Sequence, residues 1–161
     1  MAAEIQNTPT PLRQPQGSYP GKLDDKGRLK LPVKVEAYLR SLPDKEFFVT
    51  SVDKCTARIY PISIWMATVE KLDTLDGSQE DIAAYVRTAH RFGAEAEIDG
   101  SGRVQFNPEL RRGLSLEGEG LHLIPVNGWY EVITDAKMHL SEAESSEARK
   151  YRVEGMLRKK S

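Results

Sequence analysis

The sequence predicts a mixed β fold with short helices, in which two similar units of one chain share a single core. Three observations support this prediction: a length of 161 residues, a short segment that occurs twice, and the same order of helix-like and strand-like patterns after each copy. A chain of this length corresponds to about one domain. Two half-sized units would each bury too little apolar surface to fold alone, so we expect them to share one core.

The repeated segment is short and specific. Residues 24–32 read Asp-Asp-Lys-Gly-Arg-Leu-Lys-Leu-Pro, and residues 99–108 read Asp-Gly-Ser-Gly-Arg-Val-Gln-Phe-Asn-Pro. The aspartate, the glycine, the arginine and two alternating apolar residues recur at the same offset, and the proline follows with one residue inserted at Asn107. An internal repeat of this kind predicts a fold made of two related halves.

A short helix is predicted after each copy of this segment. Residues 32–42 place apolar side chains at helical spacing behind Pro32, a residue that is favoured at the first position of a helix. In the second copy Asn107 is a suitable N-cap ahead of Pro108.

Strand-like stretches follow each short helix. They are residues 47–52 with 56–60 in the first unit and residues 121–126 with 129–133 in the second. Each pair is rich in β-branched and aromatic residues around a polar turn, which predicts a β-hairpin. The second turn is Asn127-Gly128, and Asn-Gly between apolar runs is a strong hairpin signal.

The remaining segments complete the predicted organisation. Residues 65–72 and 78–92 have helical patterns, and Ser78 with Asp81 forms a capping box. The predicted division is a disordered N-terminal extension at 1–17, a first repeat at 18–64, a helical connector at 65–94, a second repeat at 95–140, and a charged C-terminal tail or helix at 141–161. This last segment is acidic and then basic, and we consider it either a solvated tail or a basic arm that touches nucleic acid or a neighbouring subunit.

Composition excludes several classes of protein. The 23 lysines and arginines against 24 aspartates and glutamates give a net charge of −1, which argues against a uniformly basic nucleic-acid-binding domain. Cys55 is the only cysteine, so neither an internal disulfide nor a cysteine-based zinc cluster is expected. No apolar run approaches about 18 residues, and residues 1–18 lack a secretory signal. We therefore expect a cytoplasmic protein with no membrane partner.

An enzyme is not expected. The candidates for acid–base or metal chemistry are Asp24 with Asp25 and the three histidines, His90, His122 and His139. The histidines fall on different predicted elements without metal-ligand spacing, and no phosphate loop or nucleophile elbow is present. The sequence therefore predicts no catalytic residues, no metal site and no cofactor.

The repeated arginines are the strongest functional signal. Each glycine can take the left-handed conformation that a tight turn needs, and the turn holds the next residue, Arg28 or Arg103, at the start of an outgoing strand. One such turn by itself is most simply an ordinary exposed turn, but a fold has no obvious need for the arginine twice. A two-stranded ribbon fits the major groove of DNA, where arginine makes bidentate bonds to guanine.

Basic residues surround the first turn. Residues 22–30 contain four basic residues against two acidic ones, so the balanced net charge hides a local excess. Phosphate contacts are expected from Lys22, Lys26, Lys30 and Arg111 or Arg112, while the two repeated arginines reach base edges.

These residues resemble the MraZ family of bacterial transcriptional regulators, which consist of two AbrB-like (SpoVT-AbrB) repeats. The resemblance rests on residues 23–32, on Tyr60-Pro61 ahead of Trp65, and on residues 98–103 with Pro108 and Leu110-Arg111, and it covers roughly residues 18–140. It implies a swapped-hairpin, double-psi-like barrel formed by the two tandem repeats, and a homo-oligomeric ring of several subunits.

The resemblance also implies a DNA site. Members of the family bind short tandem repeats in the promoter of the cell-division and cell-wall gene cluster through Asp-x-x-x-Arg motifs, which are Asp24 with Arg28 and Asp99 with Arg103 in this sequence. Lys26 falls on the family's basic turn position, whereas Ser101 leaves the second turn without that charge. The implied protein is a nucleoid-associated regulator; the alternative is a ring-forming scaffold of the same fold that has lost DNA binding.

Overall fold

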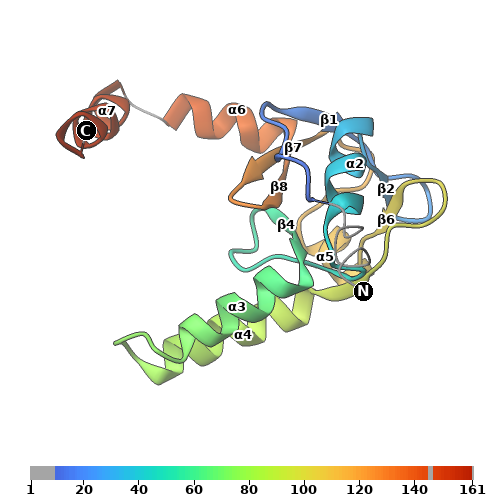
Figure 1. The fold of residues 1–161 in the computed structure, drawn as a ribbon, viewed down its shortest axis with the longest axis horizontal. Coiled ribbons are helices and arrows are strands. Elements are labelled where there is room, and N and C mark those ends of the chain that lie inside the picture. The colour runs from blue at the N-terminus through green and yellow to red at the C-terminus, as the bar shows by residue number, and fades with distance from the viewer. Residues whose placement is uncertain (1–9, 145–146, 161) are drawn as a thin grey trace, which may run out of the picture.

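The computed structural model describes residues 10–144 and 147–160. Its described strands are β1 (Tyr19–Gly21), β2 (Arg28–Lys30), β3 (Phe47–Thr50), β4 (Ala57–Pro61), β5 (Ala94–Ala96), β6 (Arg103–Gln105), β7 (Leu121–Val126) and β8 (Trp129–Thr134). They form a six-stranded antiparallel sheet in the order β1-β7-β8-β4-β3-β5 and a separate two-stranded ribbon of β2 and β6 (Figure 1).

The larger sheet is open. Within the described residues β1 and β5 stand at its two edges, and the closed barrel that the sequence suggested is not present. The physical reason is that β2 and β6 pair with each other rather than with the edge strands. The fold is a mixed α/β arrangement of an open antiparallel sheet, a small ribbon and several helices.

Strand pairing joins the two halves of the chain at four places. Strand β1 pairs with β7, β5 pairs with β3, β4 pairs with β8, and β2 pairs with β6. In each pair one strand comes from residues 18–64 and the other from residues 94–140. Neither half could therefore keep its sheet without the other.

The hairpins predicted after the short helices are confirmed, whereas the repeated segment itself does not form a regular hairpin. Strands β3 and β4 pair around the turn at 51–56, and β7 and β8 pair around Asn127-Gly128. At the first repeated segment, in contrast, only the bridge between Leu23 and Leu29 joins the two arms of the turn. The repeated segment is therefore a tight turn whose outgoing strand pairs across the molecule.

The described helices are α2 (Val33–Ser41), α3 (Ile62–Leu72), α4 (Gln79–Phe92), α5 (Pro108–Gly113), α6 (Asp135–Glu144) and α7 (Glu147–Lys160). Pro32 and Asn107 occupy the N-cap positions of α2 and α5, and Asn107 accepts a hydrogen bond from the N–H of Glu109. The inserted residue that the sequence suggested at Asn107 is therefore not an insertion. Asn107 is equivalent to Pro32, and Pro108 lies one position later, at the first position of α5.

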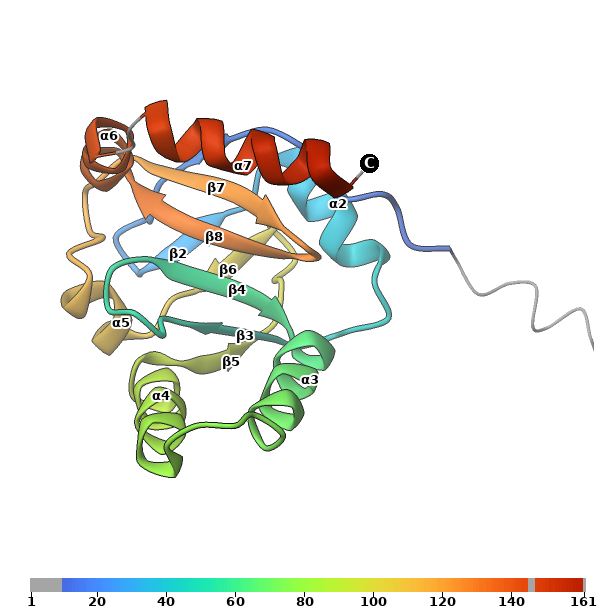
Figure 2. The ribbon, with the colours of Figure 1, turned by 90° about the vertical axis from the view of Figure 1, so that its left-hand side faces the viewer.

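The main core lies between the larger sheet, the ribbon and the helices α2 and α5 (Figure 2). Matching residues of the two repeats fill it with side chains that are almost fully buried: Leu29, Leu31, Val35 and Leu39 from the first, and Val104, Phe106, Leu110 and Leu114 from the second. The ribbon is consequently anchored from behind by the shared core.

A second cluster holds α3 and α4 against the sheet. The side chains of Phe48, Tyr60, Trp65 and Ala89 are buried together, and the rings of Phe48 and Trp65 lie 4.9 Å apart. Beyond this cluster the two helices project away from the sheets (Figure 1). None of the described helices is long and apolar enough to cross a membrane.

The N-terminal extension predicted at 1–17 falls partly outside the described residues, which begin at residue 10. Its described part makes specific contacts: the amide of Gln14 donates to the carbonyl of Trp129 and accepts from the N–H of Gly128, both at 2.9 Å. The N–H of Leu12 donates to the Ser41 hydroxyl. Residues 10–17 thus lie along the β7–β8 turn and the end of α2.

Candidate nucleic-acid interface

The two repeated turns have the same backbone hydrogen bonds. In the first, the N–H of Asp24 donates to Arg28 at 2.9 Å and that of Gly27 donates to Asp24 at 3.0 Å. In the second, Asp99, Arg103 and Gly102 make the same bonds at the same two distances. Both glycines have φ of 79°, a left-handed conformation that glycine adopts without steric cost. The repeat therefore encodes one turn geometry twice.

The aspartates close these turns through their carboxylates. Asp24 Oδ1 accepts the backbone N–H groups of Lys26 and Arg28, each at 2.9 Å. Asp99 Oδ1 accepts those of Ser101 at 2.8 Å and Arg103 at 2.9 Å. The bond from the N–H of the arginine in each motif is the main reason that the pKa of each aspartate lies below its ordinary value. Both carboxylates are thus held ionised as turn caps.

The ribbon arranges the motif side chains on one face. Arg28 lies opposite Gln105, Leu29 opposite Val104, and Lys30 opposite Arg103. Because side chains alternate along a strand, the fully buried Leu29 and Val104 form the inner face of the ribbon. The outer face consists of the four polar side chains that flank them. Each repeat thus supplies one strand to an outer face that the two repeats share.

Two further backbone bonds make this arrangement symmetric. The N–H of Leu31 donates to the carbonyl of Gly102, and the N–H of Phe106 donates to that of Gly27, both at 2.9 Å. Each outgoing strand is therefore fastened to the turn of the other repeat. The ribbon behaves as a small two-fold unit formed within one chain.

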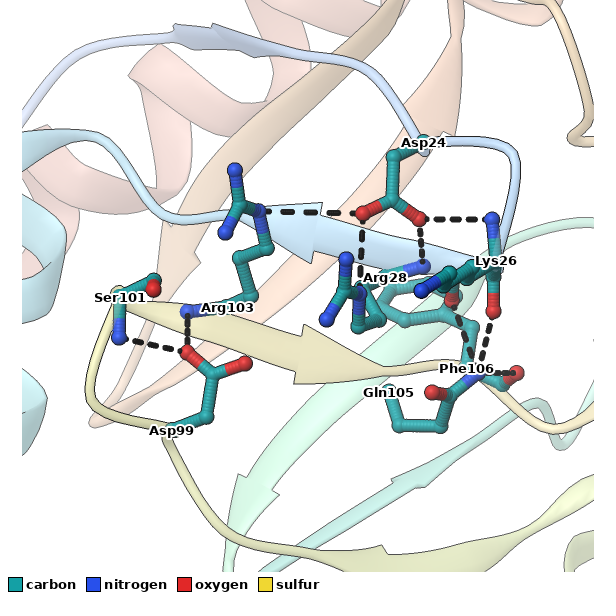
Figure 3. A network of polar contacts seen from close by, with 9 residues as sticks. Asp24, Lys26, Arg28, Asp99, Ser101, Arg103, Gln105 and Phe106 are labelled. Carbon is teal, nitrogen blue, oxygen red and sulfur yellow. Dashed lines mark hydrogen bonds and ion pairs between the residues drawn. The ribbon is translucent and has the colours of Figure 1, made fainter.

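Both repeated arginines lie beside the same carboxylate. Asp24 Oδ2 is 2.9 Å from Nε of Arg28 and 3.7 Å from Nε of Arg103 (Figure 3). The two side chains are about one third exposed. The sequence pairs each arginine with its own aspartate; the structure brings Arg103 to the aspartate of the other repeat. Asp24 is consequently the centre of the outer face.

The other two outer-face residues bind the opposite turns. Lys30 Nζ donates to the carbonyl of Ser101 and lies 3.8 Å from Glu36 Oε1. Gln105 Nε2 donates to the carbonyl of Lys26 at 2.9 Å. Gln105 does not stand out in the sequence because an amide carries no charge, but it is equivalent to Lys30 in the repeat, which marks its position.

The basic residues predicted around the ribbon differ in position. Lys22 and Lys26 are exposed, and Lys22 lines a shallow hollow together with Lys30. Arg112 is exposed on α5, where it pairs with Glu109 at 2.8 Å. Arg111 is only 15% exposed and pairs with Glu117 at 3.0 Å, so its predicted place on a phosphate is not favoured.

The glycines of the two turns are also closely covered by side chains. A Cβ built on Gly27 would lie 2.3 Å from Nη1 of Arg111, and one on Gly102 would lie 2.4 Å from Oε1 of Glu36. Both positions also have positive φ, so any other residue there is strained. The side chain that covers Gly27, Arg111, is the more buried of the two covering side chains and therefore the harder to displace.

We expect Gly27→Ala to destabilise the protein by more than the roughly 1–2 kcal/mol cost of the left-handed conformation, because the methyl group must also displace Arg111. Gly118→Ala is the matched control, since Gly118 has φ of 75° but open space around it. Urea unfolding followed by circular dichroism would measure both variants. Equal losses of stability would show that the contact with Arg111 contributes nothing.

No group of three or more potential metal ligands occurs within the described residues. His122, in β7, contacts Ser18 Oγ through Nδ1 at 3.1 Å and Asp135 Oδ1 through Nε2. These contacts tie the chain before β1 to the start of α6, away from the ribbon.

No family model matches the chain, but individual known proteins are similar to it. The chain is 32% identical to a protein of Koribacter versatilis over 137 residues, which are 81% of this chain and 88% of that protein. It is 30% identical to a protein of Acidobacterium capsulatum, over 65% of this chain and 71% of that one, and 36% identical to one of Alcanivorax borkumensis, over 63% and 70%. All three are named transcriptional regulator MraZ, and the chain therefore belongs to the MraZ family.

Proposed function

We propose that this protein is a DNA-binding transcriptional regulator that reads its promoter through the outer face of the β2–β6 ribbon. The observation that supports this most is the convergence of Arg28 and Arg103, from two repeats, on the single carboxylate of Asp24. The names of the related proteins support the regulatory part of the proposal.

The geometry of the arginines suits contact with base edges. Both contacts with Asp24 use the Nε atom, which leaves the two terminal nitrogens at the far end of each guanidinium for other acceptors. Those two nitrogens are the donors of the bidentate bond to O6 and N7 of guanine in the major groove. Asp24 would then orient both arginines from behind rather than touch DNA itself, with Asp99 in the corresponding turn-capping role.

Lysines would supply the phosphate contacts. Lys22 and Lys26 are exposed beside the first turn, and Lys30 keeps more than half of its side chain exposed although it pairs with Glu36. Phosphate contacts position a protein on DNA, whereas base contacts specify the sequence. The second turn has Ser101 in place of the lysine of the first turn and so carries less positive charge. This difference makes the two ends of the otherwise two-fold ribbon distinguishable.

The four pairings between the repeats support an AbrB-like exchange of strands, with repeats at 18–64 and 95–140. One ribbon offers few contacts to DNA. A ring-shaped homo-oligomer that places several ribbons on tandem repeats of the cell-division and cell-wall promoter would raise the effective concentration of each. Such a regulator would be found on the nucleoid, in the cytoplasm.

A salt titration tests the proposal. We expect binding to a fragment from upstream of the protein's own gene to weaken steeply with salt, and Lys26→Ala to reduce the slope of log K against log salt by about one. Arg87→Ala, on the exposed side of α4, is the control and should leave the slope unchanged. The absence of binding even at low salt would favour the ring-forming scaffold instead.

A further inference from the structure

Each half of the molecule ends in two successive helices. After the β3–β4 hairpin the chain forms α3 and the 14-residue α4, and after the β7–β8 hairpin it forms α6 and the 14-residue α7. From the sequence, α3 and α4 were expected to be a connector, and residues 141–161 a charged tail or helix. Because each pair of helices follows the second hairpin strand of its repeat, α3–α4 and α6–α7 are corresponding parts of the two halves.

The two pairs of helices differ in how they are covered. Trp65 of α3 and Ala89 of α4 are buried against the sheet. In α7, by contrast, the apolar side chains are at least half exposed: Tyr151, Val153, Met156 and Leu157. Figure 1 shows α7 standing clear of the sheets beyond α6.

A helix of this length needs a partner. Isolated helices shorter than about 12–15 residues are marginal in water, and most helical stability in proteins comes from packing of an apolar face. Val153, Met156 and Leu157 are spaced at i, i+3 and i+4, so they are neighbours on the helix surface. The helix is also basic, with six lysines and arginines against two glutamates.

The far end of the α3–α4 pair has the opposite character. Residues 70–81, from the last turn of α3 to the first turn of α4, contain five acidic residues and one lysine. Leu75 in this segment is more than half exposed, and so is Met66, which lies on α3 one turn before Glu70. This surface, which we call the acidic hairpin end, combines open apolar groups with negative charge, as α7 combines them with positive charge.

We propose that α7 of one subunit packs against the acidic hairpin end of a second copy of this chain. The inference rests on the homo-oligomeric assembly proposed above and names its interface. The two surfaces are different, so the contact is heterologous, and repeated head-to-tail contacts of this kind generate closed rings or open filaments. The ribbon takes no part in the contact and remains available.

Two variants test this interface separately. Variant A, Val153→Glu with Met156→Glu, alters α7; variant B, Met66→Lys with Leu75→Lys, alters the acidic hairpin end. Light scattering and native mass spectrometry should show several copies for the unmodified protein and monomers for each variant. An equimolar mixture should form a one-to-one heterodimer, because A keeps an intact hairpin end and B keeps an intact α7.

Controls separate this result from misfolding and from DNA binding. Val33→Glu, at an exposed position of α2, should keep the mass of the unmodified protein. Removal of residues 147–161 should also give a monomer. This truncated protein takes the place of variant A if the paired substitutions disturb the fold. An unmodified protein that is monomeric, a variant A of unchanged mass, or a mixture that stays monomeric overturns the proposal. A variant A that keeps its mass but loses DNA would make α7 a DNA-binding arm, which is a different function.

Failure of this interface and failure of the proposed function give different results. Replacement of the ribbon arginines should abolish specific DNA binding at unchanged mass, whereas variants A and B should lower the mass and leave each ribbon able to bind DNA weakly.

Discussion

Replacing Arg28 and Arg103 together by alanine should abolish the preference of this protein for its own promoter. Each bidentate arginine–guanine contact contributes about 1–3 kcal/mol of discrimination, so the loss of both corresponds to roughly 30-fold to 10⁴-fold in relative affinity. Weak, salt-sensitive binding should remain, because the lysines of the first turn still face phosphates. Titrations of the promoter fragment and of a shuffled fragment of equal length would measure the ratio.

The Arg28→Lys/Arg103→Lys variant is the matched control. It keeps both positive charges but cannot make the planar, two-pronged contact of a guanidinium. If the arginines read bases, this variant should lose the preference almost as the alanine variant does while it keeps the salt dependence. If the alanine variant still discriminates between the fragments at unchanged oligomer mass, the ribbon is not the reader.

The second large effect concerns the core behind the ribbon. Leu29 is fully buried, lies opposite Val104 in the ribbon, and approaches Gly21 of β1. Leu29→Ala should lower the free energy of unfolding by about 2–5 kcal/mol, through lost burial and the cavity that remains. This is a large part of the roughly 5–15 kcal/mol that holds a typical domain together.

Urea unfolding measures this loss directly. Val33→Ala is the control, because Val33 is 82% exposed on α2 and its truncation should change stability by less than about 0.5 kcal/mol. Similar losses for the two variants would contradict the conclusion that one shared core holds the ribbon. Since Leu29 and Val104 contact across the repeats, we also expect their substitutions to be non-additive.

Local features of this fold could be predicted from the sequence. The Asp-x-x-Gly-Arg pattern predicts its turn because the glycine and the aspartate act within five residues. The hairpins at β3–β4 and β7–β8 were also predictable, since each strand pairs with its neighbour in the chain. Short-range chemistry decides these elements.

Long-range partners could not be predicted in the same way. The apolar alternation of residues 28–30 fits any neighbouring strand, and only the packed structure shows β6 as its partner. For the same reason the sequence could not show that the folded ribbon brings the Arg103 side chain to Asp24 while the Arg103 backbone N–H binds Asp99. Arg111 looked like an exposed charge but lies under Gly27, because α5 turns that side chain inward.

Hydrogen–deuterium exchange with and without the promoter fragment would locate the DNA-contacting residues of this protein. We expect bound DNA to slow exchange in peptides covering residues 23–31 and 98–106, with little change in α3 and α4 outside subunit contacts. Protection confined to other segments, such as residues 147–160, with both turns unchanged, would contradict the assignment of the β2–β6 ribbon as the DNA-reading surface.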